Sequence, residues 1–438
     1  MTLFCILQII FVNLCAKIRK NTLQDMKTLI DAPDILHGNI ILPASKSISN
    51  RALVIRALSR SRMPIENISD CDDSSVVINA LQHMPPTIDI KAAGTAMRFL
   101  TSMLATVAGE HIITGTERMR NRPISVLVDA LRNLGADIHY TDKEGFPPLR
   151  IRGKNLSGGK LTLNGNVSSQ YISSLLMIGP TLAEGLLLEL SGEIVSRPYI
   201  DMTLCIMQCF GAQAEWVSDK TICVKPVPYT PIPYYIENDW SAASYWYEMV
   251  ALSPDKNASI TLPGLFPKSL QGDASVARIF GELGVATCFE GNTVRISKGE
   301  TPRGEFFCDM VGQPDLAQTL AVTCCLLGIH FRITGLQTLR IKETDRMAAL
   351  QRELEKLGFV VKAEDYDTLL WDGETTNGTP PDNLITIDTY DDHRMAMAFA
   401  PVSLLRTGIA INNPEVVSKS YPQFWEDMEK AGFKLTQL

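Results

Sequence analysis

The sequence has an internal period of roughly 74 residues, and this period limits the folds that the chain can adopt. Five stretches with the apolar spacing of an amphipathic helix are each followed at once by a glycine. Glycine readily adopts the left-handed conformation that ends many helices, so we predict that each helix stops there. The gaps between successive glycines are 76, 73, 74 and 74 residues. The five glycines are Gly135, Gly211, Gly284, Gly358 and Gly432.

A second series of residues runs in phase with the glycines, and each member precedes a stretch rich in Ala and Leu. Short polar and acidic residues are common N-caps, so we predict that a helix begins at each of them. The members are Thr95, Ser168, Ser241, Asp315 and Asp392. Ser47 lies only 48 residues before Thr95, and the helix predicted at 75–83 ends without a glycine. The first unit is therefore shorter than the others.

Short β-branched stretches lie between the predicted helices and indicate strands. They include residues 160–163, 186–190, 259–262 and 331–334. Each unit then has the order β-α-β-α-β-β, and such a unit cannot bury its apolar faces alone. Because six units are too many for one ordinary core, we predict an α/β protein of two domains with three units each. The helices at 317–327 and 395–405 are almost wholly apolar and should lie innermost.

The predicted helix starts of the first half suit anions. A helix N-terminus presents free N–H groups and a partial positive charge. Lys46 and Arg51 flank hydroxyls at the first start, Gly94 permits a close backbone approach at the second, and Ser168 and Ser169 supply hydroxyls at the third. Ordinary caps beside solvated basic side chains would explain any one start. Their recurrence in phase favours a cleft between the domains that binds a highly anionic ligand.

Acidic residues occupy the corresponding positions of the second half, at Asp239, Asp315 and 391–392. A carboxylate among phosphate-binding groups can take up a proton during a reaction. Two basic clusters, at 118–122 and 340–346, precede further predicted helices. A solvated surface charge run is the default explanation of each cluster, and their similar places in successive units argue against it.

Composition excludes some classes of function. A net charge of −7 argues against a protein that binds nucleic acid or a membrane surface. The ten cysteines include no CxxC pair, so we expect neither a zinc site nor a disulfide framework, and a reducing cytosol fits. We interpret Cys205, Cys209, Cys324 and Cys325 as core residues.

The first 25 residues require a separate interpretation. The apolar stretch at 3–15 is too short to span a bilayer, and basic residues follow it rather than precede it. We therefore predict that residues 1–25 are an upstream extension and that Met26 is the natural start. A degenerate signal or membrane anchor is the alternative.

Taken together, the motifs of this chain resemble those of 5-enolpyruvylshikimate-3-phosphate synthases. The resemblance covers residues 26–438 in order and rests on segments 45–51, 93–98, 122–124, 168–171, 342–346, 391–397 and 419–422. It implies the two-domain inverted α/β barrel, with three β-α-β-α-β-β repeats per domain. It also implies chain crossovers near residues 44 and 237. One domain would then contain residues 26–44 and 238–438, and 45–237 would form an inserted domain.

The resemblance also implies the reaction. The enolpyruvyl group of phosphoenolpyruvate would pass to the 5-hydroxyl of shikimate 3-phosphate, with release of phosphate, in the shikimate pathway to chorismate and the aromatic amino acids. We expect a cytoplasmic monomer whose partners are these two small substrates, with no nucleic acid, membrane, metal or organic cofactor.

The family's residue roles carry over onto matching positions. Asp315 would accept the proton of the attacking hydroxyl, Glu343 would protonate the methylene carbon of phosphoenolpyruvate, and Lys46 and His393 would assist. A glutamate in this role needs a raised pKa or protonation through a neighbour. The implied contacts of shikimate 3-phosphate are Lys46, Ser47, Arg51, Ser168, Ser169, Gln170, Ser196, Tyr199, Asp315 and Lys342. Those of phosphoenolpyruvate are Lys46, Gly94, Arg122, Gln170, Arg346, Arg394 and Lys419.

Three positions depart from the family pattern, since Ala92, Phe99 and Thr338 stand where the family usually has Asn, Pro and Asn.

One rival interpretation is an enolpyruvyl transferase acting on a UDP-linked aminosugar, but that family usually carries a reactive cysteine and segment 117–123 has none. A second rival is a non-catalytic relative that only binds anions. Such a protein has no need of two acidic residues amid phosphate-binding groups.

Overall fold

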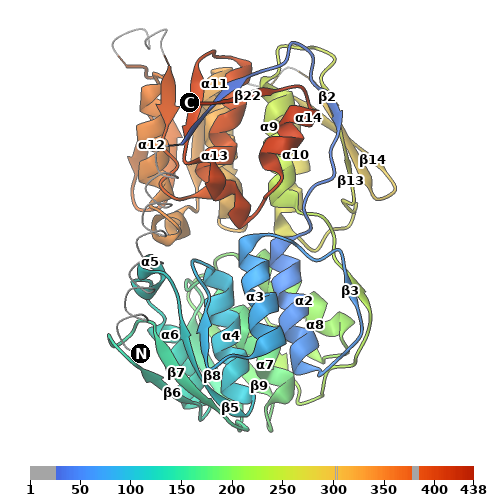
Figure 1. Cartoon of the computed structure of the whole chain (residues 1–438), viewed down its shortest axis with the longest axis vertical. Coiled ribbons are helices and arrows are strands. Elements are labelled where there is room, and N and C mark those ends of the chain that lie inside the picture. The colour runs from blue at the N-terminus through green and yellow to red at the C-terminus, as the bar shows by residue number, and fades with distance from the viewer. Residues whose placement is uncertain (1–25, 301, 303, 377–383) are drawn as a thin grey trace, which may run out of the picture.

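The computed structural model describes residues 26–300, 302, 304–376 and 384–438, so the extension predicted at 1–25 lies outside the described residues. Buried apolar side chains form two separate cores. The terminal core contains residues from 30–42 and 240–433, and the inserted core contains residues from 44–236. Figure 1 shows the two cores as two lobes, with the first strands of the chain in the lobe that also contains its second half.

Three four-stranded sheets belong to the terminal core, and each mixes parallel and antiparallel neighbours. Their strand orders are β20-β21-β1-β22, β14-β15-β13-β2 and β16-β17-β19-β18. The strands are β1 (Lys27–Asp31), β2 (His37–Asn39), β13 (Ser259–Pro263), β14 (Val285–Glu290), β15 (Thr293–Lys298), β16 (Glu305–Asp309), β17 (His330–Thr334), β18 (Lys362–Glu364), β19 (Thr368–Trp371), β20 (Ile385–Ile387), β21 (Ile409–Asn412) and β22 (Lys434–Gln437). Strands β1 and β2 thus complete two sheets whose other strands come from the second half.

The inserted core has two four-stranded sheets, ordered β4-β5-β7-β6 and β10-β11-β9-β8, and one two-stranded sheet, β12-β3. The strands are β3 (Ile65–Glu66), β4 (Thr87–Asp89), β5 (Gly109–Thr114), β6 (Asp137–Tyr140), β7 (Leu149–Gly153), β8 (Gly159–Asn164), β9 (Leu186–Ser191), β10 (Ala214–Ser218), β11 (Thr221–Val224) and β12 (Tyr234–Tyr235). The two-stranded sheet pairs β3, from the first unit that the sequence predicts to be short, with β12 at the end of the inserted segment.

Helices alternate with these strands. The α-helices are α2 (Lys46–Leu58), α3 (Asp72–His83), α4 (Gly94–Thr106), α5 (Glu117–Arg120), α6 (Ser125–Asn133), α7 (Ser169–Ile178), α8 (Arg197–Cys209), α9 (Trp240–Leu252), α10 (Val276–Glu282), α11 (Ala317–Leu327), α12 (Arg346–Lys356), α13 (His393–Phe399) and α14 (Phe424–Lys430). The 3₁₀ turns are η1 (Gly179–Thr181), η2 (Gly272–Ser275), η3 (Pro314–Leu316), η4 (Gln337–Ile341), η5 (Ala400–Leu404) and η6 (Pro414–Lys419).

The glycines that set the period end their helices as predicted. All five have φ between 80 and 100°, the left-handed region in which a Cβ is strained. Helix α3 ends at Met84 instead, which takes φ 40° without being glycine. The helix of the first unit therefore also ends in a left-handed residue, but that residue is methionine where the other units have glycine.

The predicted helix starts are right at two positions and wrong at four. Ser168 and Asp392 cap α7 and α13, with their side chains accepting the N–H groups of Gln170 and Arg394. At three of the other starts the observed cap lies two residues earlier in the chain. At the fourth, the predicted cap lies inside a 3₁₀ turn. Helix α2 begins after Ser45 rather than Ser47, α4 after Ala93 rather than Thr95, α9 after Asp239 rather than Ser241, and Asp315 lies in η3. The period located each first turn but identified the cap at only two of the six.

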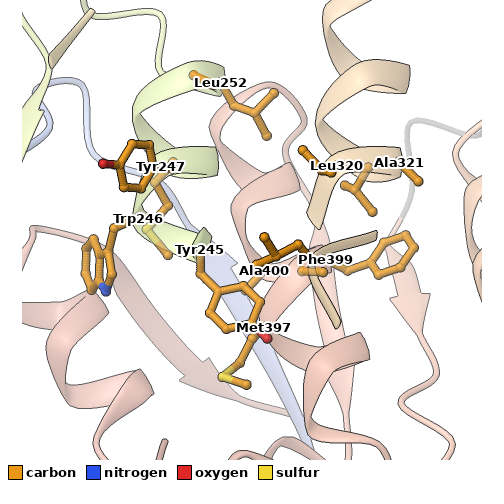
Figure 2. Packing of buried hydrophobic residues seen from close by; sticks show 14 of the residues in the cluster. Tyr245, Trp246, Tyr247, Leu252, Leu320, Ala321, Met397, Phe399 and Ala400 are labelled. Atoms are coloured by element: carbon orange, nitrogen blue, oxygen red, sulfur yellow. The ribbon is translucent and has the colours of Figure 1, made fainter. Parts of the chain in front are cut away.

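The innermost helices of the terminal core are apolar nearly all round. Figure 2 shows side chains of α9, α11 and α13 meeting one another, among them Tyr245, Leu320 and Phe399. Residues 317–325 of α11 and all of α13 are buried, which confirms the predicted inner positions. Each such large side chain contributes roughly 1.5–3 kcal/mol through burial. The second predicted helix changes to the 3₁₀ turn η5 after Phe399.

The two passages of the chain between the cores lie side by side. Ala44 and Asn238 form an antiparallel bridge, and the Asp239 N–H donates to the Pro43 carbonyl over 2.8 Å. Helices α2 and α9 begin within two residues of this bridge. The backbone N–H of Lys46 donates to the Asp239 carboxylate over 3.2 Å, so the starts of both helices are held at the junction of the cores.

Two predictions from composition can be compared with the structure. Within the described ranges, no helix combines the length and the apolar character needed to cross a membrane. Cys324 and Cys325 are buried, as a core role requires, whereas Cys205 is half-buried. Cys209 is exposed at the end of α8, so the prediction of a core role is wrong for it.

Candidate active site

Asp315 is surrounded by three cationic side chains. Its Oδ1 lies 3.3 Å from Lys342 Nζ and 2.9 Å from Arg346 Nη1, and its Oδ2 lies 3.2 Å from Arg394 Nη2. Burial favours the neutral acid, but Arg394, Lys342 and Arg346 outweigh it and hold the pKa of Asp315 well below its usual range. Asp315 is therefore ionised at neutral pH.

Arg346, the first residue of α12, joins three carboxylates. Its Nε lies 2.7 Å from Asp392 Oδ2, its Nη2 lies 2.9 Å from Glu343 Oε2, and its Nη1 binds Asp315. A second bond from Nη2 to Asp392, over 3.2 Å, makes that pair bidentate. Arg346 is 1% exposed and Asp392 is wholly buried, so this contact fixes the start of α12 against the start of α13.

Glu343 binds Lys419 as well as Arg346, with 2.7 Å between its Oε1 and Lys419 Nζ. Burial favours the protonated form of Glu343. Lys419 and Arg346 outweigh burial and hold the pKa of Glu343 well below its usual range. Of the two routes predicted for Glu343, a raised pKa is therefore not found, because the groups predicted to bind phosphoenolpyruvate contact the glutamate themselves. Protonation through a neighbour stays a prediction.

Lys46 and His393 lie near one another although they belong to different cores. Lys46 Nζ is 3.4 Å from Asp73 Oδ2; burial opposes its charge, but Asp73 and Cys71 raise the pKa of Lys46 overall. His393 is 1% exposed, and neither of its ring nitrogens makes a hydrogen bond within the described residues. Burial, followed by the nearby Lys46 charge, lowers the pKa of His393 well below its usual value, so the imidazole is neutral.

Arg122 lies over the start of α4. A Cβ added to Gly94 would lie 2.8 Å from Arg122 Nη1, so only glycine leaves the guanidinium this position. Burial, and then the neighbouring Arg98, lower the pKa of Arg122 to about 10. Among the described residues, no carboxylate forms a salt bridge with Arg98 or Arg122. Two unpaired cations at a helix N-terminus form a favourable environment for an anion.

Arg51 is buried among α2, α7 and α8. Its Nε donates to Thr203 Oγ1 over 2.7 Å, and its Nη2 donates to Ser173 Oγ and to the Tyr199 carbonyl, both over 3.2 Å. Its guanidinium also lies 5.3 Å from the ring centroid of Phe99, one of the departures from the family pattern. Burial lowers the pKa of Arg51 to about 10. Arg51 is thus a third cation that has no carboxylate partner in the part of the chain that the structure describes.

Predicted substrate-binding hydroxyls lie near these cations. The Gln170 side chain donates to Thr95 Oγ1 over 3.2 Å, which links the starts of α7 and α4. Three serine hydroxyls make no hydrogen bond within the described ranges and can bind an incoming oxyanion. They are those of Ser47, Ser169 and Ser196. Ser47 does accept Arg51 Nη1 through its carbonyl.

The two cores also touch beside Lys419 and Glu343. Ser418 Oγ donates to Asp72 over 2.6 Å, and Gln423 Nε2 donates to Asp70 over 2.6 Å. Helix α5, which lies next to the other lobe in Figure 1, directs Arg118 to the Lys342 carbonyl over 3.5 Å. The described conformation therefore brings the predicted residues of the two cores together.

Sequence reasoning missed two carboxylates at the site, Asp73 and Asp273. Asp73 had a weak signal, because it belongs to a pair of acids in the first turn of α3. Asp273 lies in a short 3₁₀ turn outside the periodic series, and nothing in its spacing distinguished it.

A pocket of about 360 Å³ between α2 and α3, lined by residues such as Arg56 and Leu81, contains none of the predicted site residues.

Comparison with known proteins gives a consistent result. A model of the family described as EPSP synthase (3-phosphoshikimate 1-carboxyvinyltransferase) matches residues 30–88 and 84–428. A 3-phosphoshikimate 1-carboxyvinyltransferase of Bacteroides fragilis is 56% identical over 409 residues, covering 93% of this chain and 98% of the relative. The protein of the same name from Aliivibrio fischeri is 36% identical over 427 residues, covering 90% and 97%.

A solved structure shows the same fold. The EPSP synthase of Acinetobacter baumannii superposes with a TM-score of 0.74 and covers 94% of this chain and all of its own, at 20% sequence identity. Its fold is the two-domain inverted α/β architecture, so the predicted fold class is confirmed. With the family model matching most of its length, the chain belongs to the EPSP synthase family.

Proposed function

We propose that this chain transfers the enolpyruvyl group of phosphoenolpyruvate to the 5-hydroxyl of shikimate 3-phosphate and releases phosphate. This is the activity for which its relatives are named. The reaction is a step of the shikimate pathway to chorismate and the aromatic amino acids. We further propose a cytoplasmic monomer that acts on these two small substrates, and the chemistry needs neither a metal nor an organic cofactor.

One observation carries the proposal: two ionised carboxylates, Asp315 and Glu343, lie within a set of cations from both cores. Carboxylates repel the anions that such cations attract, so a site that only binds phosphates would be better without them. A transferase needs them, because one proton must leave a hydroxyl and another must reach a carbon. The pair therefore supports catalysis rather than simple anion binding.

The proposed steps follow from these positions. Protonation of the methylene carbon by Glu343 makes the adjacent carbon of phosphoenolpyruvate electrophilic. The 5-hydroxyl oxygen then bonds to that carbon while Asp315 takes its proton. The new methyl group returns a proton to Glu343 as the carbon–oxygen bond to phosphate breaks, and Asp315 passes its proton to the departing phosphate. The products are the enol ether and inorganic phosphate.

Substrate binding would supply the missing proton on Glu343. The phosphate and carboxylate of phosphoenolpyruvate would pair with Lys419, Arg346 and Arg122, whose charges otherwise lower the pKa of Glu343. Once those charges are matched, burial dominates and favours the protonated acid. The neutral imidazole of His393 is the nearby group that can exchange a proton with it.

Gly94→Ala is expected to raise KM for phosphoenolpyruvate about tenfold. The new Cβ would lie 2.8 Å from Arg122 Nη1 and would displace the guanidinium, which weakens a charge-assisted hydrogen bond to the ligand. KM for shikimate 3-phosphate should change little. Steady-state kinetics with each substrate varied in turn would measure both values.

Gly281→Ala is the matched control for Gly94→Ala, because Gly281 lies in a helix and a Cβ there meets no atom within 4 Å. It should leave both KM values unchanged. An unaltered KM for phosphoenolpyruvate in Gly94→Ala would contradict the placement of Arg122 at that ligand.

Lys46→Met is expected to raise both KM values and to lower kcat about a hundredfold, because the lysine is proposed to contact both substrates and to assist proton transfer. Methionine keeps most of the length of this partly buried side chain and removes its charge. A change confined to kcat would contradict the contact with two ligands. Lys160→Met, at an exposed pair with Glu189, serves as the control.

The experiment that tests the proposed function varies the acceptor. Purified protein is mixed with phosphoenolpyruvate and either shikimate 3-phosphate or a UDP-linked aminosugar, and released phosphate is measured. We expect release with shikimate 3-phosphate only. Release with the aminosugar, or with phosphoenolpyruvate alone at the same rate, would contradict the proposal.

A further inference from the structure

Asp273 is a buried carboxylate at the junction of the two cores that the proposed mechanism does not use. It lies in η2 and is 3% exposed. The Tyr199 hydroxyl, from α8 of the inserted core, donates to it with 3.3 Å to Oδ1 and 3.5 Å to Oδ2. The Ser241 hydroxyl, from α9 of the terminal core, donates to Oδ2. One carboxylate therefore accepts a hydroxyl from each core.

The start of α8 fits closely against the turn that carries Asp273. A Cβ added to Gly272 would lie 2.6 Å from the Pro198 Cβ, so the backbone of η2 touches the proline ring. Just before α8, the Ser196 N–H donates to the Val311 carbonyl of the terminal core over 2.9 Å. We call this contact between Ser196–Tyr199 and η2 the α8 junction. Small shifts there move the start of α8 relative to the terminal core.

Tyr199 links the α8 junction to the predicted binding site of shikimate 3-phosphate. Its carbonyl accepts Arg51 Nη2 over 3.2 Å, and Arg51 also binds Thr203 one turn further along α8. The Tyr199 hydroxyl is occupied by Asp273, so it is the tyrosine ring that can face a ligand. Asp273 thus binds Tyr199, a predicted contact of shikimate 3-phosphate, directly. Through Tyr199 it is also linked to Arg51, a second predicted contact.

Charged groups surround Asp273 from both cores. Burial, with Asp315 and Asp239 nearby, raises its pKa to about 6, although Arg394 and the Ser241 hydroxyl oppose the shift. Above this pH the carboxylate accepts both hydroxyls. Below it one oxygen carries a proton and becomes a donor, so the carboxyl no longer accepts both hydroxyls in the same arrangement.

We propose that Asp273 is a positioning residue for shikimate 3-phosphate: it fixes Tyr199 across the junction of the cores and thereby sets the affinity for this substrate. The inference rests on the proposed function. It also predicts that the effect is larger for the acceptor substrate than for phosphoenolpyruvate, because among the described residues Asp273 accepts hydrogen bonds from Tyr199 and Ser241 and makes none with Arg122, Arg394 or Lys419.

The test compares Asp273→Asn with the unaltered protein in product formation from both substrates. Asparagine keeps the shape but offers one acceptor, so KM for shikimate 3-phosphate should rise about tenfold at pH 8, with kcat and KM for phosphoenolpyruvate changed less than threefold. If the unaltered protein forms no product, the proposed function fails. If it does, and Asp273→Asn has the same KM, this inference alone is overturned.

The pH dependence supplies a readout that a merely structural role would not move. The measured quantity is the KM for shikimate 3-phosphate of Asp273→Asn divided by that of the unaltered protein. This ratio should fall towards one below pH 6, because the acid form of Asp273 then resembles asparagine. Taking the ratio removes the ionisation of the substrate's own phosphate, which also occurs near pH 6. A ratio that stays constant between pH 5.5 and 8 would overturn the proposal.

Two further variants keep the test valid if Asp273→Asn folds poorly. Tyr199→Phe removes the inserted-core donor and should raise the same KM, and the double variant should show no more than the larger single effect. Additive effects would contradict the coupling. Asp427→Asn is the matched control, since Asp427 is 2% exposed and accepts the Tyr421 hydroxyl over 2.7 Å elsewhere in the terminal core. It should leave KM unchanged.

Discussion

Replacing Asp315 with asparagine is expected to lower kcat by two to four orders of magnitude, which is the usual contribution of a general base. The amide keeps the size of the side chain but cannot take the hydroxyl proton. Substrate affinity should survive or increase, because Lys342, Arg346 and Arg394 would lose a competing negative charge. Phosphate release would measure turnover, and calorimetric titration of the substrates would measure affinity.

The two readouts for Asp315→Asn separate catalysis from folding. Loss of both turnover and binding would indicate a damaged site. The control is Asp255→Asn, the same substitution at a carboxylate that is not among the predicted site residues, and it should leave turnover and substrate affinity unchanged. Turnover within tenfold of the unaltered protein would contradict the assignment of Asp315 as the base.

Arg346→Ala is expected to abolish detectable turnover and to lower the free energy of unfolding by roughly 3–5 kcal/mol. The arginine is 1% exposed and contacts three carboxylates, and its removal leaves the wholly buried Asp392 without its bidentate partner. A buried charge without a partner costs far more than the loss of an exposed pair. Urea unfolding would measure the change.

Arg278→Ala is the control for the stability measurement. Arg278 and Glu282 form an exposed pair one turn apart on α10, and their side chains are 68% and 56% exposed. Its loss should leave the urea midpoint unchanged within error. If Arg346→Ala unfolds at the same urea concentration as this control, the three-carboxylate contact does not stabilise the fold in the way described.

The period of the chain allowed most of the architecture to be predicted, because glycine is needed wherever a helix ends in a left-handed residue. Gly135 and its four equivalents identify one structural position in five units. The short length of the first unit was likewise visible in the sequence, but the two-stranded sheet β12-β3 was not predicted. These features depend on local backbone conformation, which neighbouring residues largely determine.

Contacts between distant segments could not be predicted in the same way. A cap depends on which oxygen reaches a free N–H, and at α9 that oxygen belongs to Asp239 rather than the in-phase Ser241. The lowered pKa of Glu343 depends on Lys419, which lies 76 residues further along the chain. The role proposed for Asp273 depends on a hydroxyl from the other core. Such properties arise only once the chain is folded.

The central claim is that Glu343 protonates the methylene carbon of phosphoenolpyruvate before the hydroxyl adds. Turnover in deuterated water, with the product analysed by mass spectrometry and proton NMR, tests it most directly. Because the transient methyl group carries one deuteron and then loses one hydrogen, the account predicts deuterium in the product's methylene group. Product formed at a normal rate without deuterium at that carbon would contradict it.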